Sequence, residues 1–314
     1  MEAVLSAVEI VLAIFLMIGV GILLTKIGWL SDESAPLISR LTVHVALPCT
    51  ILNNVMTYYT RESLVESGLG ILISYVMILL AMGLGLVLAR LLKLEKRRRG
   101  AFVCMFCMSN SIFIGLPVCR ALFGEAAVPS ALMYYIANTT VFWSLGNAMM
   151  RQDDDKKVPM KTMVNRMIPT PLKAFLISAV LVLLGVTLPG FIMKASGYIG
   201  NMVTPLSLIY TGIIVMRMIR RGRVKWEKGY FTILAGRFLV APAAMLGLCM
   251  LTGVSDMMRS VLVLQAAMPV MAQTSIVAAE LGADEEYSAG GITITTALSM
   301  LFIPLFMMLL SVIG

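Results

Sequence analysis

The chain has 314 residues, of which 59% are hydrophobic and only 13% are charged. This composition excludes an ordinary soluble globular protein, in which about 25% of residues are charged. The net charge of +8 does not by itself indicate a nucleic-acid-binding protein, because eighteen of the 25 Lys and Arg residues fall in three short stretches between apolar segments. We therefore expect an integral membrane protein that contacts the lipid bilayer and binds no nucleic acid.

Apolar runs of about 20 residues, the length that crosses a bilayer as a helix, recur along the whole chain. The first run follows Glu2 and contains Glu9, without the basic start of a cleaved signal peptide, so we expect it to remain in the protein. The pattern predicts an all-α integral membrane fold with ten transmembrane helices, at 7–27, 36–56, 64–89, 101–123, 127–150, 172–189, 191–216, 230–252, 258–281 and 288–312.

The three basic stretches, 90–99, 151–173 and 217–228, follow the third, fifth and seventh predicted helices. With these helix positions, all three lie on the same side of the membrane. Lys and Arg are enriched in cytoplasmic loops, so this side is predicted to be cytoplasmic and both termini are predicted to lie outside. The expected location is the plasma or inner membrane of the cell.

The fourth and ninth predicted helices are interrupted by polar residues and proline, in the runs 108–117 and 266–275. Proline removes a backbone donor and clashes with the preceding turn, so each helix is expected to break near its middle. In hydrocarbon, a broken backbone is tolerated only where protein buries it or where it lines a cavity. Paired breaks in the two halves of a chain indicate the substrate site of a secondary transporter.

The polar segment 151–171 divides the chain into residues 1–150 and 172–314, each with five predicted helices. An odd number of helices in each half places the second half upside down in the membrane, which gives an inverted repeat. The prolines support this pairing, because Pro48 and Pro205 are 157 residues apart and Pro117 and Pro269 are 152 apart.

No motif for catalysis or for a metal site is apparent. Cys104 and Cys107 have the spacing of a redox or zinc pair, but they lie within an apolar helix without a second pair, and His44 is the only histidine. There is no nucleotide-binding glycine-rich loop with lysine and no H-E-x-x-H sequence. We therefore expect neither an enzyme, nor a metal site, nor a bound cofactor.

The fourth-helix sequence Ser109-Asn110-Ser111-x-x-x-Gly115-Leu116-Pro117 resembles the corresponding motif of the auxin efflux carrier family. That family includes plant auxin exporters and bacterial permeases of malate and related carboxylates. The short segment 151–171 takes the place of the long central loop of the plant members and is typical of the compact bacterial type. Further matches are Arg40 before Pro48, the run Thr204 to Gly212, Pro269, and the run Thr295 to Ser299 before Pro304.

The resemblance implies the fold that the bile-acid symporters and sodium/proton antiporters share. Helices 1, 2, 6 and 7 would form a scaffold, often dimeric, so a homodimer is expected. Helices 3–5 and 8–10 would form a mobile transport domain that moves as an elevator. Helices 4 and 9 would cross at their breaks.

Crossed, broken helices present amide ends that can hold a carboxylate without a buried Lys or Arg. Polar side chains beside the breaks either bind the substrate or satisfy the freed backbone groups. Asn138 either faces the cavity or links helices, and Arg120 either attracts an anion or reaches the outer surface; Arg237 is a further charge in or near a span. The predicted site consists of Asn110, Ser111, Gly115, Pro117, Pro269, Gln273, Thr274, Ser275, Asn138 and Arg120, with Pro48 and Pro205 as structural hinges.

No Asp or Glu occurs in the membrane stretch of helix 4, in helix 5 or near Pro269. Because cation antiporters of this fold use carboxylates at the crossing, cation antiport is disfavoured. We predict a secondary transporter of small organic carboxylates, like malate, malonate or auxin, that works by alternating access and is driven by the membrane potential or an ion gradient. A Na⁺- or H⁺-coupled symporter of bile-acid-like or other organic anions, a channel, and a membrane receptor without transport remain alternatives, and the coupling ion is left open.

Overall fold

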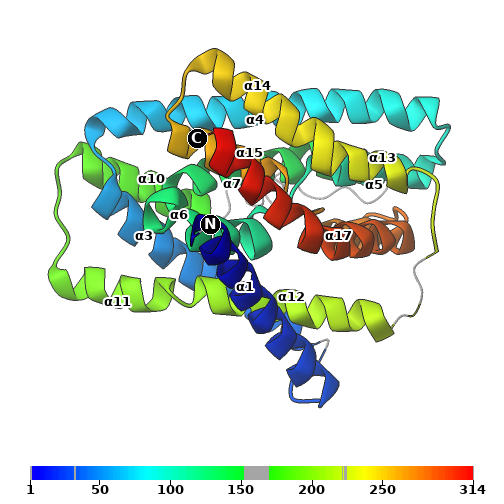
Figure 1. Cartoon of the computed structure of the whole chain (residues 1–314), viewed down its shortest axis with the longest axis horizontal. Helices are drawn as coiled ribbons and strands as arrows, with labels where there is room; N and C mark the ends of the chain where they lie inside the picture. Colours follow the sequence, from blue (N-terminus) through cyan, green and yellow to red (C-terminus); the bar gives the residue numbers. More distant parts are fainter. Residues whose placement is uncertain (1, 32, 152–169, 221, 223–224, 314) are drawn as a thin grey trace. The chain divides into compact units, whose positions relative to one another are not determined.

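The computed structural model describes residues 2–31, 33–151, 170–220, 222 and 225–313. The described residues form helices and no named strand, as Figure 1 shows. Contacts divide the chain into two compact units, and each is described here by itself. Unit 1 comprises 1–69, 112–133 and 168–221, and unit 2 comprises 70–111, 134–167 and 222–314. Most of the predicted loop 151–171 lies outside the described residues.

Unit 1 contains the helices that the resemblance assigns to a scaffold, together with the second half of the fourth predicted helix. That assignment to a fixed and a mobile part stays a prediction. Its helices are α1 (Glu2–Lys26), α2 (Ser34–Leu41), η1 (Thr42–Ala46), α3 (Leu47–Tyr58), α6 (Leu116–Phe123), η3 (Glu125–Ala127), α10 (Thr170–Leu183), α11 (Gly190–Gly200) and α12 (Val203–Arg220).

Two glycines bring α1 and α12 into backbone contact within unit 1. A Cβ atom at Gly21 would lie 2.5 Å from the Ile209 carbonyl oxygen, and one at Gly212 would lie 2.4 Å from the Ile18 carbonyl oxygen. No side chain fits between these helices at that point. Small residues allow such close approach in membranes, where van der Waals packing drives helix association. Gly212 of the family motif is thus explained by helix packing.

Unit 2 contains most of α4 (Arg61–Leu91) and α7 (Val128–Val141), and both halves of the ninth predicted helix. The helices η2 (Ser111–Gly115) and α7 and the start of α4 cross from one unit to the other. The helices that lie wholly or partly in unit 2 are α4 (Arg61–Leu91), α5 (Lys96–Cys107), η2 (Ser111–Gly115), α7 (Val128–Val141), η4 (Phe142–Gly146), α8 (Asn147–Met150), α13 (Tyr230–Ala235), η5 (Gly236–Val240), α14 (Ala241–Thr252), α15 (Asp256–Ala266), α16 (Gln273–Glu280) and α17 (Glu285–Ile313).

Proline residues follow three of the π-helical turns. Pro48, Pro117 and Pro242 each lie two residues after the end of η1, η2 and η5, respectively. A proline ring clashes with the carbonyl of the preceding turn, and a wider π-turn removes that clash without ending the helix. These prolines therefore widen helices rather than break them. Pro205 instead lies in the first turn of α12, just after an interruption at Asn201 and Met202, where its missing N–H leaves no helical bond unmade.

Every predicted span overlaps helix in the structure. Among the described residues, four helices are long and apolar enough to cross a membrane, at Ser34–Tyr58, Gly68–Leu91, Gly190–Arg217 and Tyr230–Thr252, and three shorter apolar helices lie at Leu12–Lys26, Ser111–Phe123 and Thr170–Leu183. The all-α class is thus confirmed. The number of spans and the inverted arrangement of five and five helices stay predictions.

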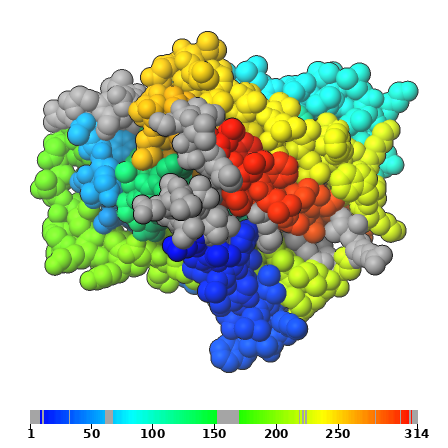
Figure 2. Space-filling model, in the orientation of Figure 1, coloured from blue at the N-terminus to red at the C-terminus, as the bar shows by residue number. Residues whose placement is uncertain are grey.

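Large apolar side chains cover the outside of both units. Leu16 on α1 is 71% exposed and Leu251 at the end of α14 is 85% exposed. Figure 2 shows α1 in blue and α14 in gold on the visible surface. Contiguous exposed apolar surface is rare on soluble monomers, and it fits helices that contact lipid. The exposure therefore agrees with a membrane protein.

Arg98, in the first turn of α5, links two other segments of unit 2. Its Nη1 donates to Glu227 Oε2 at 2.9 Å and its Nε donates to Asp284 Oδ2 at 2.8 Å. The guanidinium also lies 5.0 Å from the centroid of the Tyr287 ring, within cation–π range. All four residues lie just before or at the start of predicted spans, so this cluster fixes the ends of α5, α13 and α17 against one another.

We expect this cluster to make stability depend on pH. Burial acts to raise the pKa of Asp284, but the Tyr287 backbone N–H and the Arg98 guanidinium outweigh it and hold that pKa below its usual value of 3.8. A carboxyl with a lowered pKa stabilises the fold above its unfolded pKa, and this stabilisation is lost as pH falls through the folded pKa. Asp284→Asn should therefore lower Tm at pH 7, and the difference from wild type should shrink below about pH 4.

Thermal unfolding at neutral and acidic pH measures this effect. Asp256→Asn is the matched control, because the Asp256 side chain is 74% exposed in its ion pair with Arg259. Exposed ion pairs contribute little, so this control should leave Tm unchanged. An Asp284→Asn variant whose Tm deficit is as large in acid as at neutral pH would contradict the prediction.

Candidate functional site: the crossing of two broken helices

The fourth and ninth predicted helices break, and their extended segments pair within unit 2. Helix α5 ends at Cys107 and helix resumes at Ser111, while α15 ends at Ala266 and α16 begins at Gln273. Ser109 and Val270 form an isolated antiparallel β-bridge between the two breaks. Backbone groups freed by the breaks thus satisfy one another, as a buried backbone requires. We call this paired region, together with the helix-terminal residues that flank each break, the crossing; it comprises 107–111 and 266–273.

The bridge is formed by two backbone hydrogen bonds that flank the Ser109–Val270 pair. The Asn110 amide donates to the Pro269 carbonyl at 2.8 Å, and the Met271 amide donates to the Met108 carbonyl at 3.3 Å. Pro269 lies inside its break and serves as an acceptor. Pro117 does not lie at its break, contrary to the prediction, because the helix is already interrupted at 108–110 and Pro117 falls in the first turn of α6. The polar run before Pro117, rather than the proline itself, coincides with the interruption.

Asn138 on α7 supports the crossing from the side. Its Oδ1 accepts from the Ser109 amide at 3.1 Å, and its Nδ2 donates to the Ser109 carbonyl at 3.0 Å. The side chain is fully buried. Its amide therefore replaces the hydrogen bonds that a neighbouring strand would make. Of the two roles open for Asn138, a link between helices is the one that the described contacts support.

Two more side chains satisfy backbone groups of the crossing. Gln265 donates from Nε2 to the Ser111 carbonyl at 3.3 Å, and the Thr295 hydroxyl on α17 accepts from the Val270 amide at 3.2 Å. Because the Ser111 carbonyl can only accept, the orientation of the Gln265 amide is determined. Its Oε1 is buried and has no hydrogen-bond partner among the described residues. Sequence reasoning did not select Gln265, since a single glutamine in an apolar run carries no distinctive pattern.

Arg237 is the strongest feature that sequence reasoning left unassigned. It lies on η5 and is the only fully buried charged residue among the described side chains. Its guanidinium donates four hydrogen bonds, to the carbonyl oxygens of Cys107, Ala266 and Met268. A charged residue within a membrane span is a functional candidate by default, and this is the sequence signal that could have identified Arg237.

Three predicted site residues, Gln273, Thr274 and Ser275, form the first turn of α16 directly after the second break. Thr274 is fully buried, and its hydroxyl has no hydrogen-bond partner among the described residues. Gln273 and Ser275 are half-buried. In the first break, Asn110 and Ser111 are buried. The structure thus gathers seven of the ten predicted site residues in unit 2: Asn110, Ser111, Asn138, Pro269, Gln273, Thr274 and Ser275.

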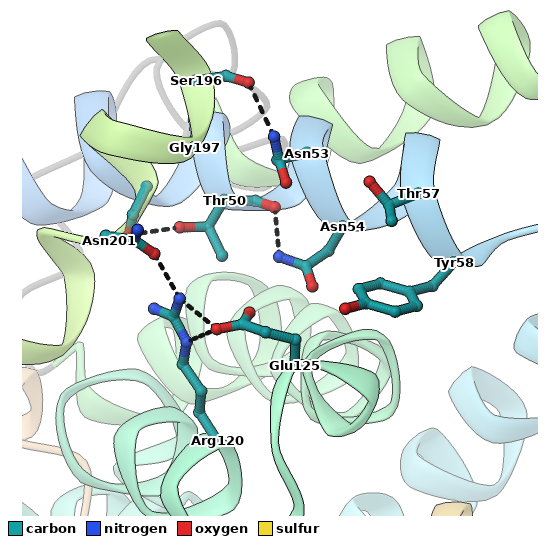
Figure 3. Close-up of a pocket in the computed structure, with 11 residues that line it drawn as sticks. Thr50, Asn53, Asn54, Thr57, Tyr58, Arg120, Glu125, Ser196, Gly197 and Asn201 are labelled. Carbon is teal, nitrogen blue, oxygen red and sulfur yellow. Dashed lines mark hydrogen bonds and ion pairs between the residues drawn. The ribbon is translucent and has the colours of Figure 1, made fainter. Parts of the chain in front are cut away.

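The other three predicted site residues, Gly115, Pro117 and Arg120, belong to unit 1. Gly115 ends η2 and Pro117 is buried in α6. Arg120 forms an ion pair with Glu125 and donates a hydrogen bond to Asn201 (Figure 3). Its charge is therefore already compensated, whereas the sequence suggested either anion attraction or an approach to the outer surface.

Arg120 also lines a pocket of about 250 Å³ in unit 1. Figure 3 shows amide and hydroxyl groups of α3 and α11 around it, including Thr50, Asn53 and Ser196. Asn53 donates to the Met193 carbonyl at 2.9 Å, and Thr50 donates to the Gly200 carbonyl at 2.9 Å. These bonds hold α3 against α11 and make the wall of the pocket polar.

Comparisons with known proteins identify the family. A family model described as a membrane transport protein, that of the auxin efflux carriers, matches residues 6–307. The chain belongs to the auxin efflux carrier family. An uncharacterized transporter of Methanocaldococcus jannaschii is 26% identical over 310 residues, covering 95% of this chain and 96% of that protein. An uncharacterized transporter of Methanothermobacter thermautotrophicus is 26% identical over 312 residues, covering 98% and 99%.

Membership in the auxin efflux carrier family confirms the resemblance read from the fourth-helix motif. It supports a membrane transporter rather than a receptor without transport, because the family model and both relatives are described as transporters. A membrane location follows from the family and the apolar helices. The specific membrane and the side on which the termini lie stay predictions.

Proposed function

We propose that this auxin efflux carrier family member is a secondary carrier of small organic carboxylates, which it moves by alternating access. The observation that carries the proposal is the chemistry of the crossing. A buried guanidinium, neutral amides and the Thr274 hydroxyl surround the breaks, and no carboxylate is fully buried among the described residues. A site with a buried positive charge and no buried negative charge among the described residues favours an anion over a cation.

The amide ends of the second half-helices support the same substrate class. Helix α16 begins at Gln273, directly after the second break, and its first turn carries the buried Thr274 hydroxyl. A helix N-terminus attracts negative charge through its dipole and its unpaired amides. The hydroxyl is a second, independent donor that has no partner within the described chain. A carboxylate oxygen would satisfy it.

The driving force follows from the charge of the substrate. Moving one elementary charge through 100 mV is worth about 2.3 kcal/mol. With a cell interior that is negative, a monovalent carboxylate is therefore driven outward without a coupling ion, while uptake requires accompanying cations. We propose transport driven by the membrane potential, with the ion-coupled alternative decided by experiment.

Flux into proteoliposomes with an imposed potential tests the proposal directly. Labelled malate, malonate, lactate and indole-acetate should show saturable flux and counterflow, and reversing the potential should reverse the net movement. Flux that never saturates would identify a channel instead. Absence of flux for every carboxylate under either potential would reject the proposed substrate class.

Thr274→Val should weaken substrate binding without harming the fold. Valine matches threonine in shape but lacks the hydroxyl. We expect KM for the transported carboxylate to rise at least about tenfold, since a hydrogen bond to a charged group contributes about 1.5–3 kcal/mol. Tm should stay unchanged, because the Thr274 hydroxyl has no partner among the described residues. Transport kinetics and thermal unfolding of the same preparation measure both effects.

Thr252→Val is the matched control for this variant. The Thr252 hydroxyl donates to the Leu248 carbonyl of its own helix, at the end of α14 and away from the crossing. KM should not change in this control. An unchanged KM in Thr274→Val would remove Thr274 from the substrate site.

A further inference from the structure

Three carbonyl oxygens of the crossing converge on one guanidinium. Arg237 Nη1 donates to Cys107 at 3.0 Å, and Nη2 donates to Ala266 at 2.7 Å and to Met268 at 2.8 Å. Nε donates to Met268 as well, at 3.0 Å. The planar guanidinium of arginine has five N–H donors and can bond three carbonyl oxygens at once, whereas the compact ammonium of lysine has only three donors.

Two of these carbonyls are the negative ends of the two broken helices. Cys107 is the last residue of α5, Ala266 is the last residue of α15, and Met268 follows within the break. The C-terminal end of a helix carries partial negative charge because its last carbonyls have no helical partner. In discontinuous transporter helices, such carbonyl ends coordinate the coupling cation. In this protein the Arg237 guanidinium already occupies these carbonyl ends.

The surrounding sequence places Arg237 close enough to reach both ends. Gly236 precedes it, and a Cβ atom there would lie 2.4 Å from the Phe106 ring, so only glycine allows η5 to approach α5 this closely. The π-helical turn of η5 also comes just before Pro242. No carboxylate is fully buried in the described part of this unit, so the charge of Arg237 is not neutralised by a buried acid.

We propose that Arg237 is a resident cation of the crossing. It holds the carbonyl ends that a coupling Na⁺ would otherwise coordinate, and it makes transport independent of sodium. Its positive charge also remains at the crossing through the whole cycle, because a guanidinium does not lose its proton in proteins. The inference rests on the proposed function in one respect, since it explains why the site takes an anion. Arg237 acts as a positioning residue and need not touch the substrate.

Removal of the side chain with chemical rescue tests this role. Arg237→Ala should lower the Tm and reduce carboxylate flux at least about tenfold, because four hydrogen bonds from a charged donor are lost. Guanidinium chloride at low concentration should raise the Tm of this variant, since the free ion can occupy the vacated position. Na⁺ should raise it as well, relative to choline. Wild-type Tm and flux should be the same in sodium and in choline.

Arg220→Ala is the matched control. Arg220 donates to one backbone carbonyl, that of Thr25, but it is exposed and lies outside the crossing. Neither guanidinium nor Na⁺ should raise its Tm. If Arg237→Ala fails to fold, Arg237→Lys keeps the charge with fewer donors, and it should retain part of the flux and remain independent of sodium.

Two results would overturn the proposal. One is a wild-type flux or Tm that rises with Na⁺ relative to choline, and the other is an Arg237→Ala variant with wild-type flux and no response to guanidinium. The Tm measurements require no substrate, so they separate this inference from the proposed function. Rescue of Tm by guanidinium without any carboxylate flux in wild type would leave Arg237 as the resident cation and reject only the substrate class.

Discussion

Replacing Asn138 by leucine is expected to abolish transport and to lower Tm strongly. The Asn138 amide pairs with both backbone groups of Ser109, at 3.1 and 3.0 Å, and it is fully buried. Leucine has a similar volume but cannot hydrogen-bond, so one N–H and one C=O would be left unpaired in an apolar environment. Each unpaired group costs about 1–3 kcal/mol. The helix break can keep its geometry only if those groups find other partners.

Thermal unfolding and counterflow of the purified variant measure this prediction. Asn53→Leu is the matched control, because the Asn53 amide also donates to a backbone carbonyl, that of Met193, but in a half-buried position outside the crossing. Its Tm should fall less. Equal losses in the two variants would mean that Asn138 has no special role in the break.

Asn138→Asp gives a sharper version of the same test. A carboxylate can accept from the Ser109 amide but cannot donate to the Ser109 carbonyl, whereas the protonated acid can do both. Transport relative to wild type should therefore be low at alkaline pH and recover as the medium is acidified. A relative flux that does not change with pH would show that donation to Ser109 is not required.

Alanine at Gly21 is expected to separate α1 from α12 and to destabilise unit 1. The added Cβ would lie 2.5 Å from the Ile209 carbonyl oxygen, which is backbone and cannot rotate away. Forcing extra atoms into such a contact typically costs about 1–3 kcal/mol. We expect a clear fall in Tm and a loss of transport at the growth temperature.

Gly19→Ala is a control on the same helix. Among the described residues, no atom lies within 4 Å of a Cβ at Gly19. Alanine there should therefore be neutral or slightly stabilising through its higher helix propensity, by up to about 1 kcal/mol. Alanine at both Gly21 and Gly212 should cost less than the sum of the single variants, because separating the helices relieves both contacts. Additive losses, or a Gly19→Ala variant as unstable as Gly21→Ala, would contradict the close approach.

Helix positions were predictable because they depend on local patterns. The apolar runs around 64–89 and 230–252 coincide with α4 and with α13 to α14, since a span needs only length and apolar side chains. The two breaks were predicted as well, from polar residues inside apolar runs. The family was identified from the motif between Ser109 and Pro117 and is confirmed by the match over 6–307.

The contacts within the candidate site were less predictable. Asn138 was selected, but its partner Ser109 lies 29 residues away. No local pattern indicates that the Asn138 side chain bonds the Ser109 backbone. Arg237 was noted only as a charge, because its acceptor Cys107 is 130 residues away in the chain. The sequence predicts Pro117 as the cause of a break, but the break lies upstream of this residue. The π-turn η2 accommodates the proline without ending the helix.

The sequence by itself determined that this is an all-helical membrane protein with two broken helices, and the motif around Asn110 indicated its family. Only the tertiary structure decided how the breaks are satisfied: by each other, by Asn138 and by a buried guanidinium. The physical reason is that hydropathy and proline act over one or two turns of helix. Hydrogen bonds between freed backbone groups, in contrast, form only where packing brings distant segments within about 3 Å.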